Sequence, residues 1–207
     1  MAGVVPTAGR SSRLGLPKPL LDANGASFVS RVVEALREGG CDSVVVVSRG
    51  DAVAVHREAL RTGATVLPSD DPDEGPIASI RTALSFLLQP TRASLPEAIL
   101  LHPVDYPLVR ATTVRKLLNA FRKSSVPLVI PYFQDRSGHP ILFGRTLFSE
   151  LLTPSLPEGA RTVSRRHRHQ ALRIDVEDSG ILADIDTVED YRNWFGADPS
   201  QVRTPSP

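Results

Sequence analysis

The stretch Ser43-Val44-Val45-Val46-Val47-Ser48 places four valines in a row. An unbroken run of β-branched residues is typical of a strand that is buried on both faces, as in a parallel sheet covered by helices on two sides. Two more short apolar runs, Ala2–Val5 and Ala98–Leu101, are separated from it by segments with helical periodicity. Because strands and helices alternate along the chain, the sequence predicts an α/β protein with a mostly parallel sheet.

Start and stop signals place the helices between these strands. Phe28–Glu38 carries apolar residues at helical spacing and is closed by Gly39-Gly40. Gly75-Pro76 opens another helix, because proline suits the first helical position. Thr187 and Asp190 have the spacing of a capping box for a last helix. Further strands are expected at Ala64–Leu67, Val126–Pro131 and Pro140–Phe143, and extended segments at Leu172–Val176 and Ile181–Ile185. Further helices are expected at Asp51–Arg61, Thr112–Arg122, Thr146–Leu152 and Gly159–His167.

The composition bounds the classes of function. The chain has 207 residues, 41% of them hydrophobic, and a net charge of +1 from 24 basic and 23 acidic residues. We expect one domain over residues 1–196, followed by a disordered, Pro- and Ser-rich tail at 197–207. The near-zero net charge argues against a nucleic-acid binder. No apolar stretch approaches the ~20 residues of a membrane helix and no segment resembles a signal peptide, so a soluble, cytoplasmic protein is expected.

A loop rich in small and basic residues follows the first expected strand: Thr7-Ala8-Gly9-Arg10-Ser11-Ser12-Arg13-Leu14-Gly15-Leu16-Pro17-Lys18. Small residues let backbone N–H groups approach phosphate oxygens, and Arg13 and Lys18 add positive charge. In an open α/β sheet, ligands bind beyond the carboxyl ends of the strands, so the loop is placed to hold a nucleoside triphosphate. Its glycine spacing fits neither the Walker A motif nor the dinucleotide fingerprint. On composition alone, a solvated basic turn is the alternative.

Carboxylates occur at the ends of two other extended segments. Asp105 follows the Ala98–Leu101 run, and Asp186 lies in Asp184-Ile185-Asp186-Thr187. Magnesium prefers one or two carboxylates together with phosphate oxygens of a substrate, so Asp105 and Asp186 are candidate ligands of one metal ion. The alternative for Asp186 is a plain N-cap of the following helix. The sequence leaves open whether Asp184 also contacts the metal.

Together, four segments resemble the MobA-like nucleotidyltransferases, and most of all their molybdenum cofactor cytidylyltransferase branch. They occur in the order of the family and are the Thr7–Lys18 loop, Val104-Asp105-Tyr106-Pro107, Gly138-His139-Pro140-Ile141-Leu142-Phe143 and Asp184-Ile185-Asp186-Thr187. The resemblance runs from about Gly3 to Phe195, nearly the whole chain. It implies a Rossmann-like, three-layer α/β/α nucleotidyltransferase fold with a mostly parallel sheet.

The resemblance also implies roles for residues of this chain. Arg13, Lys18 and Asp105 would carry the catalytic step, and Asp105 and Asp186 would hold Mg²⁺. The acceptor would approach Gly138-His139-Pro140, where the alternative for His139 is a plain turn residue. The nucleotide-binding residues that the resemblance implies are Thr7, Ala8, Gly9, Arg10, Ser11, Arg13, Lys18, Gly75, Ser79 and Asp105.

The implied reaction transfers a nucleoside monophosphate from an NTP to a small phosphorylated acceptor and releases pyrophosphate. The resemblance favours CTP as the donor, the phosphate of molybdopterin as the acceptor and a molybdenum hydroxylase as a partner, with no nucleic acid and no membrane. Thr7 stands where the family usually has a smaller residue, and its bulk is expected to narrow the base pocket in favour of a pyrimidine. The alternatives are another acceptor, such as a sugar, alcohol or lactate phosphate, or a catalytically weak carrier for a molybdenum enzyme.

Overall fold

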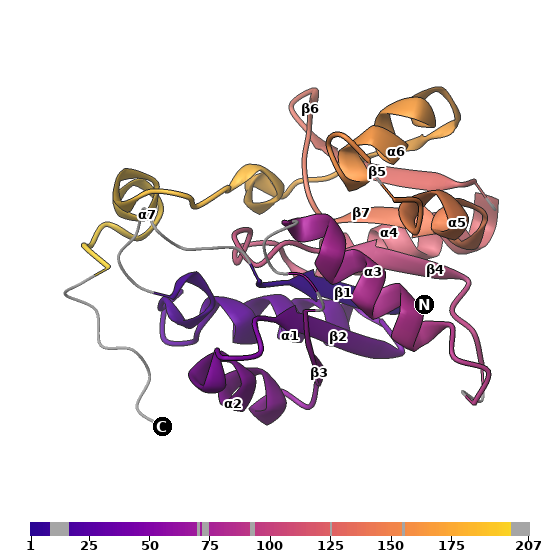
Figure 1. The fold of residues 1–207 in the computed structure, drawn as a ribbon. Coiled ribbons are helices and arrows are strands. Elements are labelled where there is room, and N and C mark those ends of the chain that lie inside the picture. Colours follow the sequence, from indigo (N-terminus) through magenta and orange to yellow (C-terminus); the bar gives the residue numbers. More distant parts are fainter. Residues whose placement is uncertain are drawn as a thin grey trace.

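The computed structural model describes residues 1–8, 17–69, 71, 75–91, 94–124, 126–154 and 156–199. Within them, eight strands form one sheet in the order β3-β2-β1-β4-β7-β5-β6, with β8 paired to β5 (Figure 1). The strands are β1 (Ala2–Pro6), β2 (Ser43–Ser48), β3 (Thr65–Pro68), β4 (Ala98–Leu101), β5 (Leu128–Phe133), β6 (Arg136–Ser137), β7 (Ile141–Gly144) and β8 (Leu172–Asp175). The α-helices are α1 (Phe28–Gly39), α2 (Val53–Arg61), α3 (Pro76–Leu87), α4 (Ala111–Ser124), α5 (Phe148–Leu151), α6 (Ala160–Arg166) and α7 (Val188–Phe195). Short 3₁₀ turns lie at Lys18–Leu20, Arg145–Leu147, Arg168–Gln170 and Ser179–Leu182.

The sheet is mostly parallel, as the sequence predicts. β1 pairs in parallel with β2 and β4, β2 with β3, and β5 with β8. β7 runs antiparallel between β4 and β5, and the short β6 forms a hairpin with β5. Only residues 134–140 separate β5 from β7. A parallel crossover needs a dozen or more residues, so β7 must run antiparallel to β5.

Helices cover both faces of the sheet, as the valine run in β2 indicates (Figure 1). Val44 and Val46 belong to one buried cluster, together with residues of α1, α4 and α7. Val45 and Val47 belong to a second buried cluster, together with residues of α3, α5 and α6. All of these valines are at most 4% exposed. The three-layer α/β/α fold expected from the sequence is therefore confirmed.

The extended conformation expected for Ile181–Ile185 is wrong at the start of this segment, which also does not join the sheet of the described residues. Ser179–Leu182 forms a 3₁₀ turn instead. The buried carboxylate of Asp178 accepts a hydrogen bond from Gly180 N at 3.1 Å and begins this turn. Gly180 also packs tightly, because a Cβ atom there would lie 2.3 Å from the carbonyl oxygen of Leu108. The alternation of buried apolar residues in this segment therefore reflects packing against the core and not strand pairing.

Most other boundaries agree with the expected ones to within a few residues. β2 and β4 coincide with the expected strands, and the capping box of Thr187 and Asp190 is present at the start of α7. The expected helix Thr146–Leu152 is divided into a 3₁₀ turn and the short helix α5. The expected tail at 197–207 lies outside the described residues from residue 200 onward. No helix in the described part of the chain combines the length and the apolarity that crossing a bilayer requires.

Two helices on the same face, α1 and α4, pack against each other at a glycine. Gly39 is the last residue of α1, and a Cβ atom there would lie 2.2 Å from Val114 Cγ1. Val114 belongs to α4 and is fully buried. Because protein interiors are close-packed, this contact leaves no room for a side chain at residue 39.

We expect Gly39→Ala to lower the free energy of unfolding by about 1–3 kcal/mol, because the added methyl group overpacks this contact. Helix propensity alone would act in the opposite direction and favour alanine by about 1 kcal/mol. Urea unfolding measures the difference. In the control, Gly39→Ala/Val114→Ala, the clash is relieved, so the double variant should lose less stability than the sum of the single variants. A Gly39→Ala variant more stable than the native chain would contradict the close contact.

Candidate active site

A cavity of about 680 Å³ opens at the carboxyl ends of β1 and β4. Its lining includes residues 6–8 at the end of β1, residues 103–106 after β4, the first turns of α3 and residues 156–161 at the start of α6. Lys18, His139, Asp184 and Asp186 complete the polar part of the lining. Strand β2 lies on one side of β1 and β4 on the other, so the cavity lies at a topological switch point of the sheet. Open α/β sheets bind their ligands at such points, and the volume is in the usual range for a ligand site.

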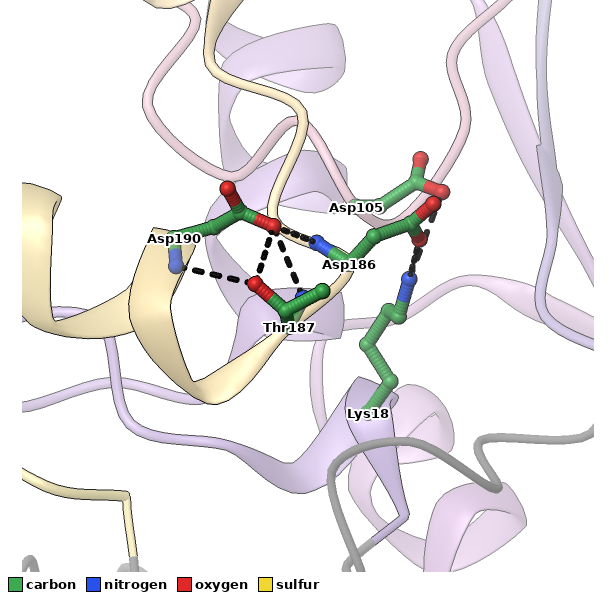
Figure 2. Close-up of polar contacts among 5 residues, drawn as sticks. All are labelled: Lys18, Asp105, Asp186, Thr187 and Asp190. Carbon is green, nitrogen blue, oxygen red and sulfur yellow. Dashed lines mark hydrogen bonds and ion pairs between the residues drawn. The ribbon is translucent and has the colours of Figure 1, made fainter.

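Three carboxylates meet in this cavity. Oxygen atoms of Asp105, Asp184 and Asp186 lie within 4.8 Å of one another. The Nζ atom of Lys18 lies 3.6 Å from Asp105 Oδ2 and forms an ion pair with Asp186 (Figure 2). Lys18 and Asp186 are 168 residues apart in the sequence. The structure therefore brings Lys18, Asp105 and Asp186 together, and Asp184 joins them.

The electrostatics of this cluster favour a bound cation. Burial raises the pKa of Asp105, and the nearby Lys18 ammonium opposes this shift. Partial burial, followed by repulsion from Asp105 and Asp186, raises the pKa of Asp184 to about 6. Asp105 Oδ1 is buried and has no hydrogen-bond partner among the described residues. Lys18 compensates only part of the negative charge, and a hard divalent cation, which prefers carboxylate oxygens, fits this set of donors.

A capping box at the start of α7 fixes the backbone of Asp186. Asp190 Oδ2 accepts hydrogen bonds from Asp186 N at 3.1 Å, from Thr187 N at 2.8 Å and from Thr187 Oγ1 at 2.7 Å (Figure 2). Asp190 N donates to Thr187 Oγ1 at 3.1 Å. Thr187 is therefore the N-cap residue, and the alternative in which Asp186 is a plain N-cap is wrong. The Asp186 carboxylate points instead toward Lys18 and Asp105.

A backbone hydrogen bond joins the two segments that carry the carboxylates. Ile185 N donates to Asp105 O at 3.0 Å, and the Ile185 side chain is fully buried. Asp184 and Asp186 flank this anchored residue. The bond therefore places both of their carboxylates beside Asp105.

The segment expected to contact the acceptor contributes His139 to the cavity, but neither Gly138 nor Pro140 is among the described lining residues. The His139 ring packs against the Tyr106 ring, with centroids 4.7 Å apart. Burial lowers the pKa of His139 to about 4, so the imidazole is neutral at pH 7. Gly138 has a packing role, because a Cβ atom there would lie 2.1 Å from the carbonyl oxygen of Ile181.

Only part of the expected nucleotide side lines the cavity. Thr7 and Ala8 do so, and the Thr7 hydroxyl donates to Val47 O at 3.0 Å. Gly75 precedes α3 as its N-cap and Ser79 is fully buried within α3, whereas other residues of that helix line the cavity. The other loop residues expected to bind the nucleotide lie outside the described part of the chain: Gly9, Arg10, Ser11 and Arg13.

The cavity also contains polar residues that the sequence did not single out for function. Tyr106 directly follows Asp105, and burial together with the charge of Asp184 raises the pKa of its hydroxyl, which stays protonated. Glu158 and Arg161 line the cavity from the start of α6. The Val104–Pro107 motif could have pointed to Tyr106, but no motif marks Glu158 or Arg161, because only the fold brings α6 to this edge of the sheet.

An α/β/α fold with an acidic, lysine-containing cavity at its switch point is typical of proteins that bind phosphorylated nucleotides together with a metal ion. The family model described as the MobA-like NTP transferase domain matches residues 3–171. The chain therefore belongs to the MobA-like NTP transferase family. The MobA-like family expected from the sequence is confirmed, whereas its cytidylyltransferase branch is not: several curated relatives are named molybdenum cofactor guanylyltransferases.

Individual relatives agree with this assignment. A probable molybdenum cofactor guanylyltransferase of Rhodopirellula baltica is 29% identical over 136 residues, which are 65% of this chain and 62% of that protein. The match thus spans less than two thirds of the curated relative's length. The crystal structure of Rv0371c from Mycobacterium tuberculosis H37Rv is 30% identical, has a TM-score of 0.78, and the match covers 95% of this chain and 97% of that one. The structure of Rv0371c in complex with manganese is 28% identical, with a TM-score of 0.74 and coverage of 95% and 98%.

We expect Lys18→Gln to have opposite effects on two ligands. The Lys18 ammonium competes with a divalent cation for Asp105 and Asp186, so without it the nucleotide-free protein should bind Mn²⁺ about tenfold more tightly. The same change should weaken NTP binding about tenfold, because a charge-assisted contact to phosphate is lost. Electron paramagnetic resonance of free Mn²⁺ measures the first effect, and equilibrium nucleotide binding measures the second.

The matched control is Lys123→Gln, at an exposed lysine in the last turn of α4. It should change neither affinity. Unchanged or weaker Mn²⁺ binding by Lys18→Gln would show that Lys18 does not compete with a cation at the carboxylates.

Proposed function

We propose that this protein is a metal-dependent nucleotidyltransferase that moves a nucleoside monophosphate from an NTP to a small phosphorylated acceptor and releases pyrophosphate. The observation that carries the proposal is the cluster of Asp105, Asp184 and Asp186 around Lys18, at the switch point of the sheet. Membership of the MobA-like NTP transferase family supports it. The acidic cluster and the family point to the same chemistry.

The proposed reaction needs no protein nucleophile. The second pKa of a phosphate monoester is near ~6, so the acceptor phosphate is largely ionised at pH 7 and needs no general base. One of its oxygens forms a bond to the α-phosphorus of the NTP while the bond from that phosphorus to the bridging oxygen breaks. Pyrophosphate leaves with the electron pair of the broken bond. Catalysis then consists of alignment and of neutralising charge.

The roles proposed for this chain's residues follow from that need. Lys18 binds phosphate oxygens and offsets the charge that develops on them, and Arg13 is proposed to do the same from the loop. Asp105 and Asp186, with Asp184 beside them, are proposed to hold the divalent cation, which when bound neutralises phosphate charge. The complex of the similar protein Rv0371c with manganese supports a divalent metal here. His139 is proposed to face the acceptor.

For the acceptor we propose the phosphate of molybdopterin, and for the donor GTP. Molybdenum cofactor guanylyltransferases among the curated relatives support both. The sequence favours CTP through its resemblance to the cytidylyltransferase branch, and Thr7 is expected in addition to narrow the base pocket. The Thr7 hydroxyl instead bonds to Val47 O in the neighbouring strand, so its polar atom is directed at the sheet. This bond engages the hydroxyl of Thr7 but leaves its bulk at the cavity, so CTP stays as the alternative donor.

We expect Asp105→Asn to lower turnover by about a hundredfold or more while the fold stays intact. A neutral amide holds a hard cation less well than a carboxylate does, and the cation's charge is worth several kcal/mol in the transition state. Pyrophosphate release at limiting Mg²⁺ measures the rate. The control Asp42→Asn changes an exposed aspartate that precedes β2, at the opposite edge of the sheet, and should leave the rate unchanged. Near-native turnover of Asp105→Asn would show that Asp105 is not a metal ligand.

We expect GTP to bind more tightly than CTP in the presence of Mg²⁺. A pocket that pairs with one base edge rejects another base because buried polar groups are left unpaired. Equilibrium binding of both nucleotides tests the preference, and pyrophosphate release with each NTP against molybdopterin and against sugar, alcohol and lactate phosphates tests the acceptor. Tighter binding of CTP would reverse the donor assignment. Absence of pyrophosphate release with every pair would overturn the transferase itself.

A further inference from the structure

A buried histidine closes the loop that carries Asp105. His102 directly follows β4 and is 0% exposed. Its backbone N–H donates to Val4 O in β1 at 2.9 Å, so the residue is attached to the sheet. Its ring nitrogen Nε2 lies 3.1 Å from the backbone oxygen of Tyr106. The side chain of His102 therefore spans residues 103–105 and ties the far end of the loop back to the sheet.

The protonation of this histidine follows from its surroundings. Burial lowers the pKa of His102 to about 3, so the ring is neutral at pH 7. A carbonyl oxygen can only accept a hydrogen bond, so the single ring proton must be on Nε2. Nδ1 is then an acceptor, and it is buried with no hydrogen-bond partner among the described residues. Within the described part of the chain, the orientation of the ring accordingly depends on its hydrogen bond to Tyr106 O.

Tyr106 connects this hydrogen bond to the carboxylates. Its ring packs against His139, and its hydroxyl lies near the Asp184 carboxylate, whose charge helps to raise the pKa of the hydroxyl. Asp105 itself is held from the other side, where Ile185 N donates to Asp105 O at 3.0 Å. A shift of the Tyr106 backbone would therefore disturb Asp105 and Asp184 together.

We propose that His102 is a positioning residue, whose Nε2–H···O=C hydrogen bond to Tyr106 fixes the 103–106 loop so that Asp105 and Asp184 share one divalent cation with Asp186. This inference rests on the proposed function, because it concerns the metal site of that reaction. His102 does not act on the substrate: it is fully buried and is not among the described residues that line the cavity. Residues behind metal ligands commonly matter in this way, because they orient the groups that bind the metal.

Three variants separate the hydrogen bond from the volume and polarity of the ring. Gln places an amide N–H₂ near the position of Nε2 and should replace the donor. Asn has the same amide on a shorter side chain that cannot reach Tyr106 O, and Leu has similar bulk without a donor. We expect His102→Leu and His102→Asn to bind Mn²⁺ about 10–100-fold more weakly, and His102→Gln to stay within about threefold of the native protein.

Electron paramagnetic resonance of free Mn²⁺ gives these affinities without any need for turnover. If His102→Leu fails to fold, as thermal unfolding will show, the comparison of His102→Gln with His102→Asn still decides the question. If His102 had a purely structural role, the variants would lose stability, but His102→Asn and His102→Leu would not bind Mn²⁺ more weakly than His102→Gln does. Native affinity in a folded His102→Asn or His102→Leu variant would overturn the proposal.

A second measurement distinguishes failure of this inference from failure of the proposed function. If the native protein binds no Mn²⁺, the metal site and the proposed function fail, and His102 no longer positions a metal ligand. If the native protein binds Mn²⁺, ring ¹⁵N chemical shifts should show the His102 proton on Nε2, and hydrogen exchange at Ile185 N should be faster in His102→Asn than in His102→Gln. A proton on Nδ1, or equal exchange in the two variants, would refute the inference while leaving the transferase proposal intact.

Discussion

Repulsion between carboxylates is the constraint on which the rest of this structure depends. Asp105, Asp184 and Asp186 crowd their oxygens within 4.8 Å at one edge of the sheet. Such a cluster is costly unless a cation compensates it, and Lys18 supplies part of that compensation from the loop after β1. In the fold, β1 and β4 are neighbouring strands, and the segment that precedes α7 lies beside their carboxyl ends. Lys18 and the carboxylates are thereby brought together. The candidate site is thus assembled from segments that no local sequence pattern connects.

Local chemistry explains which parts of the fold could be predicted from the sequence. The valines of β2 predict a strand buried on both faces because each face must pack against helices, and the two buried clusters divide them in alternation. Thr187 and Asp190 predict the start of α7 because a capping box depends only on residues three apart. Lys18 and Asp105 could be chosen as candidates because each follows an expected strand.

The parts that could not be predicted depend on tertiary contacts. Ile181–Ile185 has the alternation of a strand, but the Asp178 carboxylate and the close approach of Gly180 to Leu108 turn the chain away from the sheet. The sequence also showed no sign of the packing role of Gly138, where a Cβ atom would clash with Ile181 O. Arg161 reaches the cavity only because α6 packs at this edge, and no spacing in the sequence reports that.

The ion pair of Lys18 has a consequence for how the protein is made and maintained. In small metal-dependent domains, the ion supplies the free energy of folding, and chelators unfold the chain. Here an internal ammonium already stands among the carboxylates, and two buried apolar clusters supply the core. A newly synthesised chain can therefore complete its fold before any metal arrives. We therefore expect the abundance of the protein in a cell to respond little to the supply of divalent ions.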